Sequence, residues 1–185
     1  MGRRSDTRER TLRTAANLFR TQGYHGTGLN QVLAEGGLPK GSLYFHFPGG
    51  KEQLAAEAVT MAAGELCEWV RATLAAAPDP AAGLDAVVGG LAEHLAESDF
   101  QRGCPIGTVA PDGGEVVRAA CVTAFATWHS VTRDFLALHG VPNADTLATT
   151  VLAALEGAQL LARTTHDTAP LYAVGATLRT LVRGN

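Results

Sequence analysis

The stretch that decides the fold is TGLNQVLAEGGLPKGSLYFHFPGGK, residues 27–51 of a chain of 185. Its first half predicts a short helix, because apolar residues recur at helical spacing behind Thr27, which is a good N-cap. Gly36 and Gly37 then end that helix, and Pro39 opens a second one at a position where its missing N–H is harmless. Two short helices joined by a glycine turn predict a helix-turn-helix motif.

The second of these helices has the composition of a segment that enters the major groove of DNA. Lys40 and Ser42 can donate hydrogen bonds to phosphates or base edges, and Gly41 leaves no side chain between the backbone and the duplex. Tyr44 adds a flat ring that carries a hydroxyl group. Lys51 falls where the next helix should begin, so its cation opposes the helix dipole, and a DNA phosphate bound there would offset the mismatch.

A solvated surface position is the alternative interpretation of any single lysine. Lys40 and Lys51 are the only lysines in the chain, however, and both fall in this motif. The charge is also uneven: residues 1–51 hold eight Lys/Arg and three Asp/Glu, a net charge of +5, whereas the remaining residues hold seven and fifteen, a net charge of −8. A basic head on an acidic body is typical of a protein that places one face on nucleic acid.

Residues 19–59, FRTQGYHGTGLNQVLAEGGLPKGSLYFHFPGGKEQLAAEAV, resemble the DNA-binding head of the tetracycline-repressor (TetR) family of bacterial regulators. The resemblance is carried by G-Y-x-x-T, K-G-S-L-Y-x-H-F and K-E-x-L, in register. The chain departs from the family at Gly49-Gly50, where many relatives have one Ser or Asn, and at Thr27-Gly28, where hydroxyl residues are more usual. The residues predicted to contact double-stranded DNA are Thr27, Asn30, Gln31, Pro39, Lys40, Gly41, Ser42, Tyr44, Phe45, His46 and Lys51.

The rest of the chain predicts helices and no strands, and therefore an all-α fold. We expect an N-terminal three-helix head, the helix-turn-helix DNA-binding domain, over residues 1–50. A long helix joins it to a helical ligand-binding and dimerisation domain over residues 51–185. The expected helices outside the motif are 6–21, 51–77, 80–98, 115–139, 144–164 and 168–183.

The ends of these expected helices follow from capping residues, glycine and proline. Asp6 and Glu9 have the spacing of a capping box for the first helix, and Gly23 ends it. Residues 100–114 are punctuated by glycine and proline, so they predict a loop with at most one short helix, around residues 106–109.

Several classes of protein are excluded. Met1 is followed by charged residues and not by a signal peptide, and no apolar run is long enough to cross a bilayer. Cys67, Cys104 and Cys121 are odd in number and widely spaced, which fits neither a disulfide framework nor a zinc site. The six histidines also lack metal spacing, and His46 is expected to pack or to meet a phosphate. We therefore expect a cytoplasmic protein with free thiols, no membrane partner, no cofactor, no metal and no catalytic residue.

The body predicts a small-molecule pocket, because aromatic side chains and a few polar groups recur along its helices. Residues 102–112, RGCPIGTVAPD, also resemble a stretch in a subgroup of TetR-like regulators that includes repressors of multidrug efflux, which implies a body built to sense small molecules. For each aromatic taken singly, ordinary core is the alternative. The predicted ligand-binding residues are Trp69, His94, Phe100, Cys104, Val109, Phe125, Trp128, His129 and Gln159.

Cys104 has three interpretations: a pocket wall, a redox sensor and a nucleophile. A sensor needs a lowered pKa, to which Arg102 could contribute, and a nucleophile needs a base placed beside it. We favour the pocket wall.

An apolar stripe runs along the last two expected helices, and small residues beside it permit close helix packing. In TetR-like proteins this pair of helices forms a four-helix dimer interface, so the resemblance implies a homodimer, with packing inside one chain as the alternative. The stripe consists of Leu147, Val151, Leu155, Leu171, Val174, Leu178 and Leu181.

Together these features predict a ligand-responsive transcriptional regulator, most simply a repressor. It would bind a palindromic operator as a dimer and be released by a small hydrophobic or aromatic effector. The alternative is an α-helical small-molecule carrier or enzyme whose basic head is not a specific DNA reader.

Overall fold

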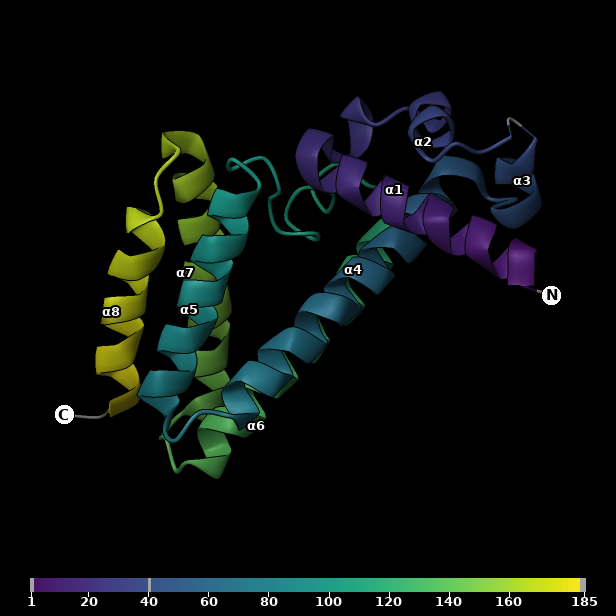
Figure 1. The fold of residues 1–185 in the computed structure, drawn as a ribbon. Helices are drawn as coiled ribbons and strands as arrows, with labels where there is room; N and C mark the ends of the chain where they lie inside the picture. Colours follow the sequence, from purple (N-terminus) through teal and green to yellow (C-terminus); the bar gives the residue numbers. More distant parts are fainter. Residues whose placement is uncertain (1, 40, 184–185) are drawn as a thin grey trace. The chain divides into compact units, whose positions relative to one another are not determined.

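The computed structural model describes residues 2–39 and 41–183, and within them the side chains of residues 2–5 and of Ser42 are left aside. This part of the chain is all α-helical, without a strand, as the sequence predicts (Figure 1). None of its helices is both apolar and long enough to cross a bilayer. In chain order the helices are α1 (Gly2–Gly26), α2 (Leu29–Glu35), α3 (Ser42–His46), α4 (Gly50–Ala75), α5 (Pro80–Glu97), α6 (Glu115–Leu138), α7 (Ala144–Thr165) and α8 (Ala169–Arg183).

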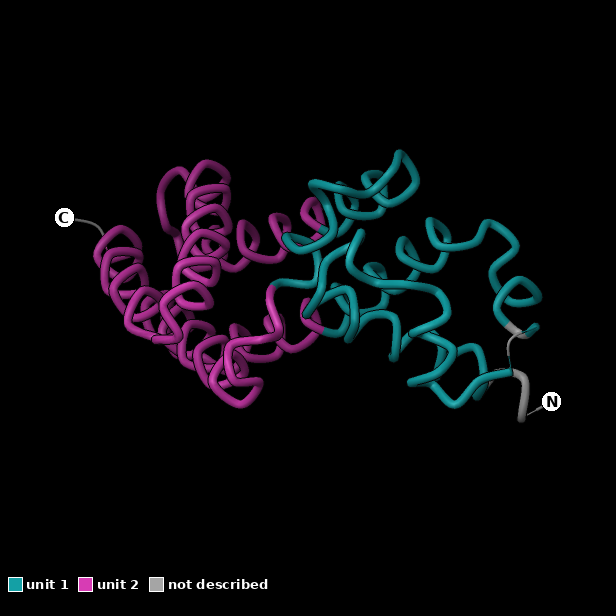
Figure 2. Tube along the Cα trace, turned by 90° about the horizontal axis from the view of Figure 1, so that it is seen from above, with its two compact units in different colours: residues 1–65, 104–124 teal, residues 66–103, 125–185 magenta. Residues whose placement is uncertain are grey.

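The chain divides into two compact units (Figure 2). Unit 1 comprises residues 1–65 and 104–124, and unit 2 comprises residues 66–103 and 125–185. Helices α4 and α6 each contribute one part to each unit. This grouping differs from the expected division at residue 50. The first part of α4 belongs to unit 1, where Glu57 and Glu65 form ion pairs with Arg8 and Arg13 on α1.

Two expected caps are wrong. Helix α1 begins at Gly2, ahead of Asp6, so there is no capping box, and Glu9 instead pairs with Arg13 one turn later. Gly28 is the N-cap of α2, whereas Thr27 is buried and its hydroxyl donates to the carbonyl of Gly23 at 2.9 Å. Both predictions used only neighbouring residues, and neither α1 nor α2 starts where they placed it.

Gly23 breaks α1 as the sequence predicts, although one more turn follows the break. Its φ of +74° lies in the left-handed region that favours glycine. A Cβ atom at this position would also lie 3.3 Å from the carbonyl oxygen of Thr108, so the backbone at Thr108 packs closely on this bend.

The core of unit 1 forms where the apolar stripe of α1 meets α2, α3 and the start of α4. Phe19, Val32, Leu43, Phe47 and Leu54 are all essentially inaccessible to solvent. Burying each such side chain stabilises the fold by about 1.5–3 kcal/mol, so helices this short depend on one another.

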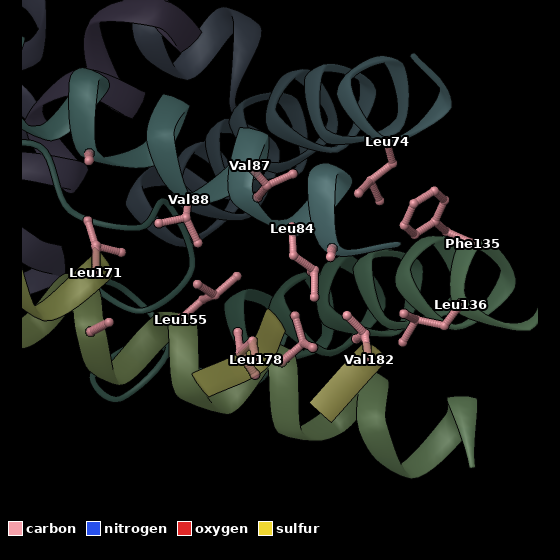
Figure 3. Close-up of a cluster of buried hydrophobic side chains, with 14 of the residues drawn as sticks. Leu74, Leu84, Val87, Val88, Phe135, Leu136, Leu155, Leu171, Leu178 and Val182 are labelled. Carbon is pink, nitrogen blue, oxygen red and sulfur yellow. The ribbon is translucent and has the colours of Figure 1, made fainter. Parts of the chain in front are cut away.

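The core of unit 2 is built mainly by α5, α7 and α8 (Figure 3). Val88 on α5 lies against Gly175 on α8, where a Cβ atom would come within 3.1 Å of both Val88 methyl groups. The stripe predicted to meet a partner subunit packs here instead: Val151, Leu155, Leu171 and Leu178 are buried in this core, and Leu147 and Val174 pack against it. Helical spacing marks an apolar face but does not say which neighbour covers it.

Residues 101–114 form a loop of consecutive turns with no helix at 106–109. Just before it, Asp99 and Phe100 adopt positive φ values of 50° and 58°. Arg163 on α7 fixes this bend by donating to the carbonyl oxygens of Phe100, at 3.3 Å, and Gln101, at 2.9 Å.

Candidate functional site

Backbone hydrogen bonds fix the glycine turn that ends α2. The Gly36 N–H donates to the Val32 carbonyl at 3.0 Å, and the Leu38 N–H donates to the Leu33 carbonyl at 2.9 Å. Gly37 has a φ of +60°, and Leu38 is buried beside the turn. These bonds satisfy carbonyl groups at the end of α2 and fix the backbone from Gly36 to Leu38.

Helix α3 buries one face and exposes two aromatic rings on the other. Leu43 and the adjoining Phe47 are buried, whereas Tyr44 is 64% and Phe45 is 66% exposed. His46 is half-buried. Exposed aromatic rings side by side on a short helix are typical of a contact surface.

The other predicted DNA-contacting residues differ in exposure. Asn30, Pro39 and Gly41 are exposed, whereas Gln31 is half-buried and donates to Glu35 at 2.9 Å. Thr27, being buried, does not present its hydroxyl to solvent. Lys40 lies outside the described residues, as does the side chain of Ser42.

Lys51 lies in the first turn of α4 with its ammonium 4.6 Å from the centre of the Tyr24 ring. Burial lowers the pKa of Lys51, and burial followed by the charge of Glu52 raises the pKa of Tyr24. Among the described residues no carboxylate lies within ion-pair distance of the Lys51 ammonium. A cation held by a neutral ring remains able to bind an anion.

Part of the basic charge of the head is neutralised within unit 1. Arg8 forms an ion pair with Glu57 on α4 and lies over the Phe47 ring at 5.1 Å, and Arg13 pairs with Glu65 at 3.1 Å. Counted over all of unit 1, nine Lys/Arg face eight Asp/Glu, which leaves a net charge of +1.

Unit 2 holds a small apolar cavity of about 60 Å³ between α4, α5, α6 and α7. Of the predicted ligand-binding residues, Trp128 and Gln159 line it. A wider hollow of about 390 Å³ lies between α6 and α7 and is lined by Phe125 and His129. The ring of Phe125 meets that of Trp128 edge-on, with centroids 5.7 Å apart.

The remaining predicted ligand-binding residues line neither space. Trp69 is 37% exposed and lies against Gly90 on α5, where a Cβ atom would come within 2.3 Å of the indole. His94 is half-buried, and the half-buried Phe100 contacts His166 with ring centroids 5.4 Å apart. Both Cys104 and Val109 belong to unit 1.

Cys104 and Val109 are both buried in the loop of unit 1. The Cys104 sulfur accepts from the backbone N–H groups of Ile106 and Gly107, each at 3.4 Å. All three cysteines are free thiols, and the described residues contain no cluster that could hold a metal ion.

Two polar residues that line the cavity were not predicted, Thr132 and Glu156. Thr132 is buried one turn after Trp128, and its hydroxyl donates to the Trp128 carbonyl at 3.0 Å. Glu156 lies three residues before Gln159, so the helical period relates it to a residue that was predicted. That spacing was the signal that could have found it.

Comparisons with known proteins cover both parts of the chain. Residues 12–58 match the family described as "Bacterial regulatory proteins, tetR family", and residues 80–177 match "Transcriptional regulator LmrA/YxaF-like, C-terminal domain". The HTH-type transcriptional regulator LmrA of Bacillus subtilis is 40% identical over 187 residues, with 96% of this chain and 97% of that protein covered. The uncharacterized HTH-type transcriptional regulator YxaF of the same organism is 35% identical, with coverage of 99% and 98%.

Solved structures share the fold. A TetR transcriptional regulator from Chloroflexus aurantiacus has a TM-score of 0.85 and 31% identity, with 100% of this chain and 98% of that chain covered. A cysteine mutant of the TetR family regulator CifR in complex with operator DNA has a TM-score of 0.81 at 23% identity, with coverage of 92% and 94%. These matches favour a regulator over the carrier or enzyme, and the chain belongs to the TetR family of bacterial transcriptional regulators.

Proposed function

We propose that this regulator is a repressor that binds a palindromic operator as a homodimer and is released by a small hydrophobic or aromatic molecule. The observation that carries the proposal is the exposed face of α3, where Tyr44 and Phe45 stand in solvent while the opposite face is buried. This helix follows α2 after a glycine turn, the order of elements in a helix-turn-helix motif.

Within this proposal, Lys51 binds a backbone phosphate. Its ammonium has a neutral ring for a neighbour and stands at the start of α4, where the backbone N–H groups also favour an anion. Phosphate contacts position a protein on DNA without reading sequence, whereas the face of α3 would contact base edges.

A dimer is supported by the outer surface of α7 and α8, which carries apolar side chains beside small ones. Leu160 is 64% exposed, and Leu161, Tyr172 and Leu181 are also largely exposed. An apolar surface of this kind on two adjacent helices suits a two-fold contact between identical copies. The exposed small residues along it are Ala153, Gly157, Ala173 and Ala176.

The effector would bind in unit 2, and α4 and α6 would carry its effect to unit 1 because each helix contributes to both units. Lys51 stands at the beginning of α4, and cavity-lining residues such as Val70 lie further along the same helix. A regulator of this kind acts in the cytoplasm, where its operator is found.

The test is recovery of the bound genomic DNA followed by footprinting. We expect a near-palindrome whose half-sites lie about one helical turn, 34–36 Å, or a multiple of it apart. A single asymmetric half-site bound by a monomer would contradict the proposal. In the same assay, Lys51→Ala should weaken binding to all sequences alike and lower the salt slope by about one unit, whereas Arg71→Ala on the same helix should leave both unchanged.

A further inference from the structure

Two neighbouring residues in the first turn of α4 carry opposite charges and have different partners. The Lys51 ammonium lies 4.6 Å from the centre of the Tyr24 ring. The Glu52 carboxylate instead accepts a hydrogen bond, 3.1 Å long, from the backbone N–H of Val116 on α6. Adjacent residues of a helix point in different directions, and no ion pair joins Lys51 to Glu52, both of which lie in the described part of the chain. All four residues belong to unit 1.

The start of α6 has room for this carboxylate and donors to bind it. Helix α6 begins at Glu115, so the Val116 N–H is one of the N-terminal donors that have no partner inside the helix. A Cβ atom at Gly114 would lie 2.3 Å from the Glu52 Oε1 atom, so the absence of a side chain there leaves room for the carboxylate. The positive end of the α6 dipole acts on the same oxygen atom. The N-terminus of α6 therefore compensates the charge of Glu52.

Glu52 lies close enough to the Lys51 site for its charge to act there. Burial, followed by the charge of Glu52, raises the pKa of Tyr24, the residue whose ring holds Lys51. The other carboxylates that α4 contributes to unit 1 pair with arginines of α1, whereas Glu52 has the N-terminus of α6 as its partner. A carboxylate without a partner at this place would repel a phosphate bound by Lys51, because like charges at short range cost free energy.

We propose that DNA binding by Lys51 depends on where the Glu52 side chain is held. The first turn of α6 compensates the Glu52 carboxylate, which would otherwise repel the phosphate that Lys51 binds. Glu52 therefore acts through Lys51 as a positioning residue, and the first turn of α6 influences DNA affinity although it lies outside the helix-turn-helix motif. This inference rests on the proposed function, since it requires Lys51 to bind a phosphate.

The first experiment compares Glu52→Asp with Glu52→Asn on the full chain, using a duplex that carries the footprinted site and a second duplex of scrambled sequence. Both new side chains are one methylene group shorter, so both variants lose the bond to Val116 and only Glu52→Asp keeps the charge. We expect Glu52→Asp to bind both duplexes about tenfold more weakly than Glu52→Asn does, because phosphate contacts do not depend on sequence. The difference should shrink between about 0.05 M and about 0.3 M salt, since salt screens exposed charges. Equal affinities of the two variants at low salt would overturn the proposal.

A second set of variants displaces the carboxylate without changing it. Gly114→Ala should push the carboxylate away from α6 and weaken binding to both duplexes about fivefold. Adding Glu52→Gln should restore the affinity to within about twofold of the wild type, because the displaced side chain is then neutral. The matched control adds Glu115→Gln instead, which removes an exposed carboxylate from the same end of α6 and should leave the loss in place. If the Gly114→Ala, Glu52→Gln double variant is folded by circular dichroism and binds as weakly as Gly114→Ala, the altered backbone causes the loss and the proposal is overturned.

The two proposals fail in different ways. A wild-type protein that retains no specific DNA overturns the proposed function, whatever the variants at position 52 do. A wild-type protein that binds its operator and loses affinity in Lys51→Ala, while Glu52→Asp and Glu52→Asn bind DNA equally, overturns only the role of Glu52.

Discussion

Glu52 in the first turn of α4 accepts a hydrogen bond from the backbone N–H of Val116 in the first turn of α6, at 3.1 Å. The carboxylate thereby caps α6 and interacts favourably with the positive end of its dipole. Gly114 makes room for this contact, because a Cβ atom there would lie 2.3 Å from the Glu52 Oε1 atom. Two helices far apart in sequence are thus joined next to Lys51.

Removing this cap should destabilise the protein. We expect Glu52→Ala to lower the free energy of unfolding by about 1 kcal/mol, the usual effect of losing a helix cap, as measured by urea denaturation. Gly114→Ala should have a similar effect, because the added methyl group displaces the same carboxylate. Glu68→Ala, at an exposed position of α4, is the control and should stay within about 0.5 kcal/mol. Equal midpoints for Glu52→Ala and Glu68→Ala would contradict the capping role.

The aromatic residues around α3 should separate DNA binding from stability. Tyr44→Ala and Phe45→Ala remove rings that are 64% and 66% exposed, so the free energy of unfolding should change by less than about 0.5 kcal/mol while operator affinity falls. Phe47→Ala removes a fully buried ring from the same region and should cost about 3–5 kcal/mol. Urea denaturation measures the stability of the three variants, and operator titration measures their affinity for DNA. Exposed-ring variants that bind the operator as the wild type does would remove α3 from the DNA interface.

Buried thiols should make the protein less stable in alkali. Burial raises the pKa of Cys121, and burial, partly offset by Arg71, raises the pKa of Cys67. The folded state therefore keeps both protons to a higher pH than the unfolded chain, whose thiols have a pKa of about 8.5. This contribution is complete below that pH and is lost as the pH rises through the folded-state pKa values. The urea midpoint should fall less between pH 7.5 and 9.5 in a Cys67→Ala, Cys121→Ala double variant than in the wild type, and equal falls would refute this linkage.

The sequence predicted most of the fold because its signals are local. Gly36 and Gly37 end α2 as predicted, and the longer helices end within a few residues of where proline and glycine predicted. The prediction that Pro39 opens the second helix is wrong, because α3 begins at Ser42 with Gly41 as its N-cap. The contact of Glu52 with Val116 joins residues far apart in the chain, and no local pattern reports it.

The prediction of ligand-binding residues is limited in the same way, because it depends on local signals. Residue type, aromatic or polar, identified Trp128 and Gln159, which line the cavity, and it also identified Trp69, which is partly exposed against Gly90. The two tryptophans are of the same residue type. Which of them border an empty volume depends on how helices pack, and Glu156 was missed because a glutamate on a helix is ordinarily a solvated residue.

The outer face of α7 and α8 provides the last prediction. Leu160 is 64% exposed, whereas Leu178 is buried in the core of unit 2, so the same substitution should act differently at the two positions. Leu160→Glu should leave the chain folded but dissociate the proposed dimer, because like charges would meet across its two-fold axis and an apolar contact would be lost. Leu178→Glu should unfold unit 2, since it buries an unpaired carboxylate. Sedimentation with circular dichroism distinguishes the two results. A Leu160→Glu variant that remains dimeric at micromolar concentration would place the subunit contact on another face, whereas a folded monomer that binds the palindrome weakly would show that two copies are needed to read it.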